Sequence, residues 1–108
     1  MNKYESIIII KPNENKEEIN KTLDKFKKQI ESFSNKNVNM EDLGEKRLAY
    51  EIQGNQKGYY ALFKFYAKPE SISELERHYR IDDNILKFIT VRQEVEEFEE
   101  TEDEEEAL

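Results

Sequence analysis

Apolar and polar residues alternate along several short stretches of the chain, and each such stretch predicts a β-strand. In residues 3–11 two sets of side chains alternate, and isoleucine occurs in both sets. Apolar residues on both faces are typical of a strand inside a sheet. Pro12 ends the pattern, because proline has no N–H to give to a ladder. We therefore predict a central strand here, covered on one face and partly covered on the other.

A helical period follows the first strand. Asn15 is a favourable N-cap, and Glu17 and Glu18 follow near the positive end of the helix dipole. Apolar residues then recur at spacings of three and four and form a single stripe: Ile19, Leu23, Phe26, Ile30 and Phe33. The polar residues 34–37 end this helix.

Residues 38–52 and 59–67 predict an antiparallel hairpin. The first stretch reads as an edge strand with Leu48, Tyr50 and Ile52 on one buried face. Gly44 interrupts that strand, which is typical of a bulge. Residues 54–58 contain two glycines and an asparagine and therefore predict the connecting turn.

A second helix and a last strand complete the pattern. Ser71 and Glu74 have the spacing of a capping box, so we expect the helix to begin there. Its apolar stripe consists of Ile72, Leu75 and Tyr79. Residues 85–92 then form a strand that separates Phe88 and Thr90 from three residues on its other face: Lys87, Ile89 and Val91.

The order β-α-β-β-α-β predicts an α+β, ferredoxin-like sandwich: a four-stranded antiparallel sheet with two helices on one face. We call the helix-free side the open face. Charged residues there are expected to be Lys3, Glu5, Lys64 and Lys87. Its apolar residues are expected to be Ile7, Ile9, Tyr60, Leu62, Tyr66, Ile89 and Val91. So wide a patch favours a contact surface, although a half-apolar solvated face is the simpler alternative.

Charge divides the 108-residue chain into two parts. The net charge is −8, but residues 94–108 hold 10 of the 25 acidic side chains and no basic one. Residues 1–93 therefore carry 17 basic and 15 acidic side chains, or +2. A block of like charges with few apolar residues cannot form a core. We predict one domain over residues 1–93 and a disordered acidic tail over residues 94–108.

The residue types exclude several kinds of site. There is no cysteine, so disulfides, thiolate metal ligands and thiol nucleophiles are impossible. The single histidine, His78, falls on the polar flank of the second helix and is expected to be solvated. None of the three glycines opens a helix as a phosphate loop requires. We predict no catalytic site and no cofactor.

Nothing resembles a signal peptide or a membrane span, since the apolar run of residues 7–10 is too short for either. We expect an intracellular, soluble protein. The fold alone does not decide function, because it also serves enzymes and dimerising sensors. Those remain the alternative to a binding protein.

Residues 57–64 lie on the strand where an RNA recognition motif carries its stacking aromatics. Lys57, Gly58 and Tyr59 fit that octamer. Tyr60 stands where a small residue is needed, and Ala61 and Lys64 stand where aromatics are needed. Core packing explains the aromatics of this strand better.

A second pattern is more specific. Residues 44–52, Gly-Glu-Lys-Arg-Leu-Ala-Tyr-Glu-Ile, resemble the signature of the bacterial small-subunit ribosomal protein six family. That signature is Gly, any residue, a basic residue, a polar or charged residue, Leu-Ala-Tyr, any residue and Ile. The residue that follows the signature is usually basic or small in that family, whereas this chain has Gln53 there. The similarity covers residues 1–93, including 3–5, 12–13, 57–59, 75–77 and 80–84.

The resemblance implies a structural constituent of the small ribosomal subunit in the cytoplasm. It implies binding to the central domain of 16S ribosomal RNA as a heterodimer with small-subunit ribosomal protein eighteen, without a membrane or small-molecule substrate. Carried over by position, the RNA contacts would be Lys3, Arg80, Lys87 and Arg92. The partner contacts would be Asp42, Lys46, Arg47, Tyr50, Leu62, Ile89 and Val91, with the first three forming an acidic-basic cluster.

Charge supports a joint mode of binding independently. For each phosphate that a protein neutralises, log K falls with the logarithm of the salt concentration with a slope of about 0.9 on duplex and about 0.7 on single strands. A domain of +2 can make only a few such contacts, so we expect weak RNA binding without a basic partner.

Overall fold

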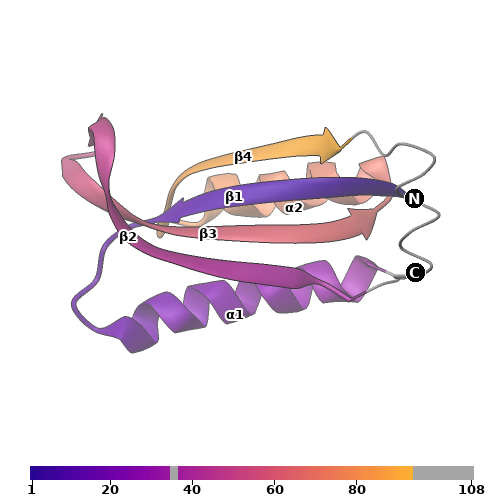
Figure 1. Cartoon of the computed structure of the whole chain (residues 1–108), viewed down its shortest axis with the longest axis horizontal. Helices are drawn as coiled ribbons and strands as arrows, with labels where there is room; N and C mark the ends of the chain where they lie inside the picture. The colour runs from indigo at the N-terminus through magenta and orange to yellow at the C-terminus, as the bar shows by residue number, and fades with distance from the viewer. Residues whose placement is uncertain (35–36, 94–108) are drawn as a thin grey trace.

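The computed structural model describes residues 1–34 and 37–93. The predicted tail, residues 94–108, lies outside the described residues. Within them the elements are β1 (Asn2–Ile10), α1 (Lys16–Phe33), β2 (Asn39–Ile52), β3 (Asn55–Ala67), α2 (Pro69–Ile81) and β4 (Ile85–Gln93). The strands form one antiparallel sheet in the order β2-β3-β1-β4 (Figure 1). This confirms the ferredoxin-like α+β prediction, with β1 central and β2 at an edge.

The main core lies between the sheet and both helices. Ile8 on β1 and Phe63 on β3 are fully buried on the helix side, as are Phe26 of α1 and Leu75 of α2. All four belong to one continuous cluster of apolar side chains. The alternation predicted for β1 is therefore confirmed, and the opposite side of the sheet is the open face.

A polar network crosses this core. The Ser6 Oγ and Tyr79 OH lie 2.8 Å apart, and Thr90 donates to Ser6 Oγ at 3.0 Å. Ser6 is fully buried and Tyr79 is only 1% exposed. Burial raises the pKa of the Tyr79 hydroxyl well above its usual value, so it stays protonated. The network satisfies groups that would be costly to bury alone.

The two helices begin for different reasons. The Asn15 side chain accepts from the Glu17 N–H at 3.0 Å, as predicted for α1. The capping box predicted at Ser71 is wrong, because α2 already begins at Pro69. Lys68 is the N-cap and its side chain makes no capping bond. Proline suits the first helical position, where its missing N–H has no intrahelical partner to lose.

Polar contacts also join the helices. Lys25 on α1 pairs with Asp82 at the end of α2, with 2.6 Å between Nζ and Oδ2. The prediction that His78 is solvated is wrong. Its side chain is 34% exposed, its Nδ1 lies 2.6 Å from Gln29 Nε2 on α1, and its Nε2 lies 3.1 Å from the Glu74 carboxylate.

The β2–β3 hairpin turns earlier in the chain and more tightly than predicted. Gln53 and Gly54 form a two-residue turn with positive φ angles of 50° and 80°, and β3 starts at Asn55. The turn predicted over residues 54–58 is therefore wrong. Gly58 lies inside a strand, where a Cβ would come within 2.3 Å of Ile9 Cγ2. The glycine there permits close packing rather than a turn.

Gly44 forms the predicted bulge. Its φ is +83°, and the register of β2 with β3 shifts between Asp42 and Gly44. The Asp42 carboxylate accepts from the Gly44 N–H at 3.1 Å and so supports the kink.

The buried face predicted beyond that bulge is only partly right. Leu48 is 8% exposed, but Tyr50 is 61% exposed and Ile52 is half-buried. Leu48 belongs to a second, smaller group of apolar residues on the open face, which we call the hairpin cluster: Ile9, Leu48 and Leu86, with Ile52 and Tyr60 packed against them.

Candidate functional site

The register of the strands arranges the open face into transverse rows. One row runs from Glu41 through Leu62 and Ile7 to Ile89. On one side of it lies the row Lys64, Glu5 and Val91, and beyond that Tyr66, Lys3 and Gln93. On its other side lies the row Gly44, Tyr60, Ile9 and Lys87. All seven apolar residues predicted for this face therefore share it.

The apolar centre of this face is incompletely covered. Leu62 and Ile7 are half-buried, whereas Ile89 is 52% and Val91 45% exposed on the edge strand β4. Lys64 borders this centre and pairs with Glu41, with 3.3 Å between Nζ and Oε2. An apolar stripe with a charged rim has the composition of a protein contact surface.

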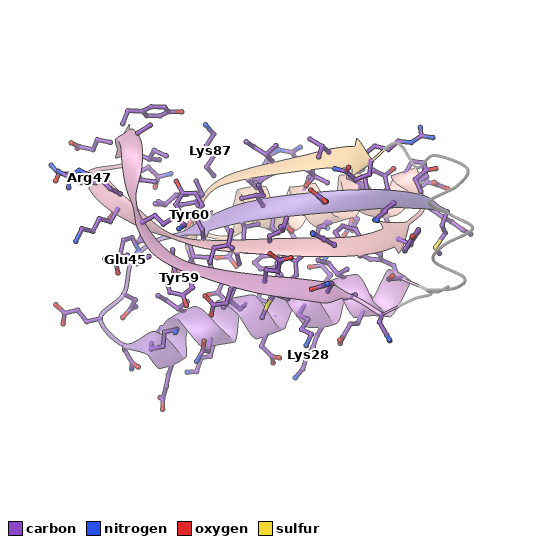
Figure 2. The ribbon with its side chains drawn as sticks, viewed as in Figure 1. Lys28, Glu45, Arg47, Tyr59, Tyr60 and Lys87 are labelled. Atoms are coloured by element: carbon purple, nitrogen blue, oxygen red, sulfur yellow. The ribbon has the colours of Figure 1, made fainter. Side chains whose placement is uncertain are left out.

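The hairpin forms a wall at one end of the open face. Its far end turns up beside the start of β4 (Figure 1). There the Lys87 Nζ donates to the Tyr50 hydroxyl at 2.8 Å and lies 5.4 Å from the centre of the Tyr50 ring. This hydrogen bond raises the pKa of Lys87 from its ordinary value. Lys87 projects from β4 on the side towards which the hairpin rises, and Arg47 points outward from the hairpin end (Figure 2).

The predicted acidic-basic cluster is not assembled. Lys46 and Arg47 are exposed and lie opposite Gly58 and Lys57. Asp42 lies opposite Ala61 on the helix side of β2, where it accepts from the Tyr59 hydroxyl at 2.6 Å. The bulge separates Asp42 from the basic pair and changes which face each residue occupies.

Asp42 instead joins the start of α1. The Lys16 Nζ lies 5.1 Å from the centre of the Tyr59 ring. A hydrogen bond with Tyr59, and to a smaller extent the Asp42 charge, raise the pKa of Lys16. This group fastens the edge strand to the helix layer.

The four predicted RNA-contacting residues do not form one patch. Lys3 and Lys87 share the open face but lie opposite Gln93 and Ile9, about 20 Å apart along β1. Arg92 pairs with Tyr4 in the register and belongs to the helix side. Arg80 lies on α2, 5.7 Å from the Phe88 ring and 3.9 Å from the Glu76 carboxylate.

Sequence reasoning missed some residues around the hairpin. Leu86 packs into the hairpin cluster, and Lys57 lies 3.8 Å from the Glu45 carboxylate. The dipeptide Gln53-Gly54 was an available signal. A two-residue turn there would have placed residues 55–58 in the strand and Lys57 beside Arg47.

No group of three potential ligand side chains in residues 1–34 and 37–93 is arranged to hold a metal ion. Within the same ranges, no helix has the length and apolar composition needed to cross a membrane.

Comparison with known proteins decides the family. The family model described as Ribosomal protein S6 matches residues 3–92. The chain belongs to the ribosomal protein S6 family. This confirms the resemblance seen in residues 44–52 and identifies a protein of the small ribosomal subunit, and hence of the cytoplasmic ribosome.

Individual relatives agree with that assignment. The small ribosomal subunit protein bS6 of Helicobacter hepaticus is 43% identical over 91 residues, which are 84% of this chain and 66% of the relative. The bS6 protein of Caldanaerobacter subterraneus is 36% identical over 92 residues, 85% of this chain and 97% of the relative. The crystal structure of 30S ribosomal protein S6 from Thermotoga maritima has a TM-score of 0.79 and 30% identity, covering 97% of this chain and 95% of that one.

Members of the S6 family are structural ribosomal proteins. The family assignment therefore confirms the prediction that this chain is not an enzyme and removes the enzyme or sensor alternative.

Proposed function

We propose that this S6-family protein binds the central domain of 16S ribosomal RNA as a heterodimer with small-subunit ribosomal protein eighteen. The open face serves as the protein contact. The basic residues around it contribute RNA contacts that become sufficient only together with those of the partner.

The exposed apolar centre of the open face is the observation that carries this proposal. Ile89 and Val91 extend the half-buried pair Leu62 and Ile7 onto the edge strand. Contact surfaces concentrate binding energy in such a centre, and the surrounding polar rim excludes water. In this proposal Tyr50 bounds the contact at the hairpin end, and Lys46 and Arg47 meet the partner along the β2 edge. Asp42 then acts indirectly, by fastening β2 through Tyr59.

Charge supports the division of labour. Residues 1–93 have a net charge of +2, and several of their lysines already pair with carboxylates, for example Lys25 with Asp82 and Lys64 with Glu41. Basic and acidic side chains nearly balance in residues 1–93, so RNA affinity should depend on a basic partner. Lys3, Arg80, Lys87 and Arg92 are proposed as separate phosphate contacts rather than one basic patch.

A binding experiment with matched variants tests the protein contact. Ile89→Glu places a charge in the proposed contact, whereas Ile81→Glu places one on α2 at a residue that is 66% exposed. We expect Ile89→Glu to weaken binding to purified protein eighteen at least tenfold, as loss of a central apolar contact does. Ile81→Glu should leave it within about twofold. Equal affinities of the two variants would refute the proposed surface.

RNA binding is measured in the same series. Titration of a central-domain fragment of 16S ribosomal RNA should give weak binding by each protein alone and tight binding by both together. Binding by this chain alone with the affinity of the pair would contradict the joint mode.

A further inference from the structure

The backbone ladder of the hairpin is interrupted where the hairpin bends. Arg47 pairs with Lys57, and the next register pair is Ile52 with Asn55. Between these pairs β2 contributes residues 48–51, whereas β3 contributes only Gln56. Four residues opposite one cannot continue a regular ladder, and such an irregularity bends the longer strand. Backbone pairing therefore fixes the bend of residues 48–51 only at its two ends.

Side chains from this unpaired stretch make the contacts that the backbone lacks. Leu48 is buried in the hairpin cluster beside Gly58, where the missing Cβ leaves room for Ile9. Tyr50 lies on the same alternating face of β2 and meets Lys87 of β4. β2 and β4 are the two edges of the sheet, with β3 and β1 between them. The Tyr50–Lys87 contact thus joins one edge strand to the other across the open face.

We propose that the Tyr50–Lys87 contact is a latch that keeps the distal hairpin, residues 45–58, bent over the open face, and that the bent hairpin is the form on which the protein partner docks. The second half of this inference rests on the proposed function. In this inference Tyr50 and Lys87 are positioning residues, because they set the shape of the wall beside the apolar centre.

The geometry gives the latch two separable parts. One is the hydrogen bond from the Lys87 Nζ to the Tyr50 hydroxyl at 2.8 Å, and the other is the contact of the same ammonium with the ring at 5.4 Å. Both groups are exposed, so each part is weak and the hairpin can open locally without unfolding the domain. Tyr50→Phe removes only the hydrogen bond, whereas Lys87→Met removes both parts and keeps most of the apolar stem.

Amide hydrogen exchange in the isolated protein tests the latch without any partner. We expect the amides of residues 45–58 to exchange about three to ten times faster in Tyr50→Phe, the range that loss of one hydrogen bond produces. They should exchange faster still in Lys87→Met. The double variant should exchange no faster than Lys87→Met, because the hydrogen bond is already absent there.

Lys3→Met is the matched control. Like Lys87→Met, it removes one positive charge from the open face. Lys3 lies near the start of β1, however, whereas Lys87 lies opposite Ile9 near the end of β1. Its hairpin amides should exchange as in the parent. Unchanged exchange in Lys87→Met, or equal acceleration in Lys3→Met, would overturn the latch.

Binding to purified protein eighteen, without RNA, tests the positioning role. Because both parts of the latch are weak, loss of one should leave an appreciable fraction of the hairpin open. Tyr50→Phe should therefore weaken binding measurably, by a factor no larger than its acceleration of exchange, and the salt dependence should not change because no charge is lost. Faster exchange with unchanged affinity would overturn the positioning role. A parent protein that fails to bind protein eighteen would sink the proposed function, while the exchange data would still decide the latch.

Discussion

At the scale of single residues, small side chains decide how closely the strands approach. Gly58 has an ordinary negative φ, so it is not needed for a turn; its role is to leave space for Ile9. Ser6 is similarly small and lets the Tyr79 hydroxyl enter the core beneath β1. Each position yields a stability prediction.

Gly58→Ala should destabilise the protein by about 1–3 kcal/mol, the usual cost of forcing an extra carbon into a packed site. Its Cβ would come within 2.3 Å of Ile9 Cγ2 and 3.2 Å of Leu48 Cδ2. A double-mutant cycle of Gly58→Ala with Ile9→Ala, measured by denaturant unfolding, checks whether the clash with Ile9 causes the loss of stability. The alanine at position 58 should cost much less when Ile9 is truncated, and an equal cost in both backgrounds would exclude the clash.

Ser6→Ala should cost about 1–3 kcal/mol, because it leaves the buried Tyr79 hydroxyl without its Ser6 partner. Combining it with Tyr79→Phe should cost less than the two single changes together, since both ends of the bond are then apolar. Additive losses in chemical denaturation would mean that the hydrogen bond does not couple these residues.

At the scale of elements, sequence periodicity predicted the strands and helices but not all of their ends. The stripes of the two helices and the alternation of β1 are long patterns, so apolar burial determines them. The start of α2 depends on one residue, Pro69, whose favourable place at the first helical position outweighed the Ser71–Glu74 spacing. The turn was misplaced because glycine has two uses: Gly58 was assigned to the turn but serves close packing, whereas the turn is formed by Gln53 and Gly54.

In the candidate site, too, some features follow from sequence periodicity and others do not. The seven apolar residues predicted for the open face follow from alternation and all lie there, but Leu86, which joins the hairpin cluster, was not predicted. The exposure of Tyr50 was not, because it depends on an irregular register between residues 47 and 52. Likewise the bulge at Gly44 was predicted. That it separates Asp42 from Lys46 could not be predicted, because this depends on which residues of β3 each of them faces.

The turn of the hairpin gives a prediction at this scale. Gln53 and Gly54 both have positive φ, as in a type I′ turn, which favours Asn-Gly. Gln53→Asn should stabilise the protein by about 0.5–1 kcal/mol, because asparagine tolerates the left-handed conformation better than glutamine does. Thermal and denaturant unfolding measure the gain. Gln56→Asn, the same exchange within a strand, should be neutral or unfavourable; a similar gain there would argue against the turn as the cause.

At the scale of the whole molecule, charge is unevenly divided. Residues 94–108 contribute ten carboxylates, so removing them changes the formal net charge from −8 to +2. A change of this size alters long-range interactions with polyanions more than any single substitution does.

Truncation after Gln93 should therefore increase non-specific affinity for single-stranded RNA at low salt. The difference from the full chain should shrink as ionic strength rises, because screening reduces the repulsion of the carboxylates. Fluorescence titration with a labelled oligonucleotide at several salt concentrations measures both effects. Replacing the ten carboxylates by Gln and Asn at full length controls for chain length. A truncated protein with unchanged affinity at low salt would show that the tail charges do not act on RNA.

The central place of β1 constrains when the sheet can form during synthesis. β1 is made first, yet its partners are β3, up to residue 67, and β4, up to residue 93. Until those segments leave the exit tunnel, the nascent chain carries the run Ile7–Ile10 without its native neighbours. Such apolar segments are prone to aggregation while they are unpaired. The native sheet can close only after translation of the domain is complete, so folding occurs late and depends on contacts distant in sequence.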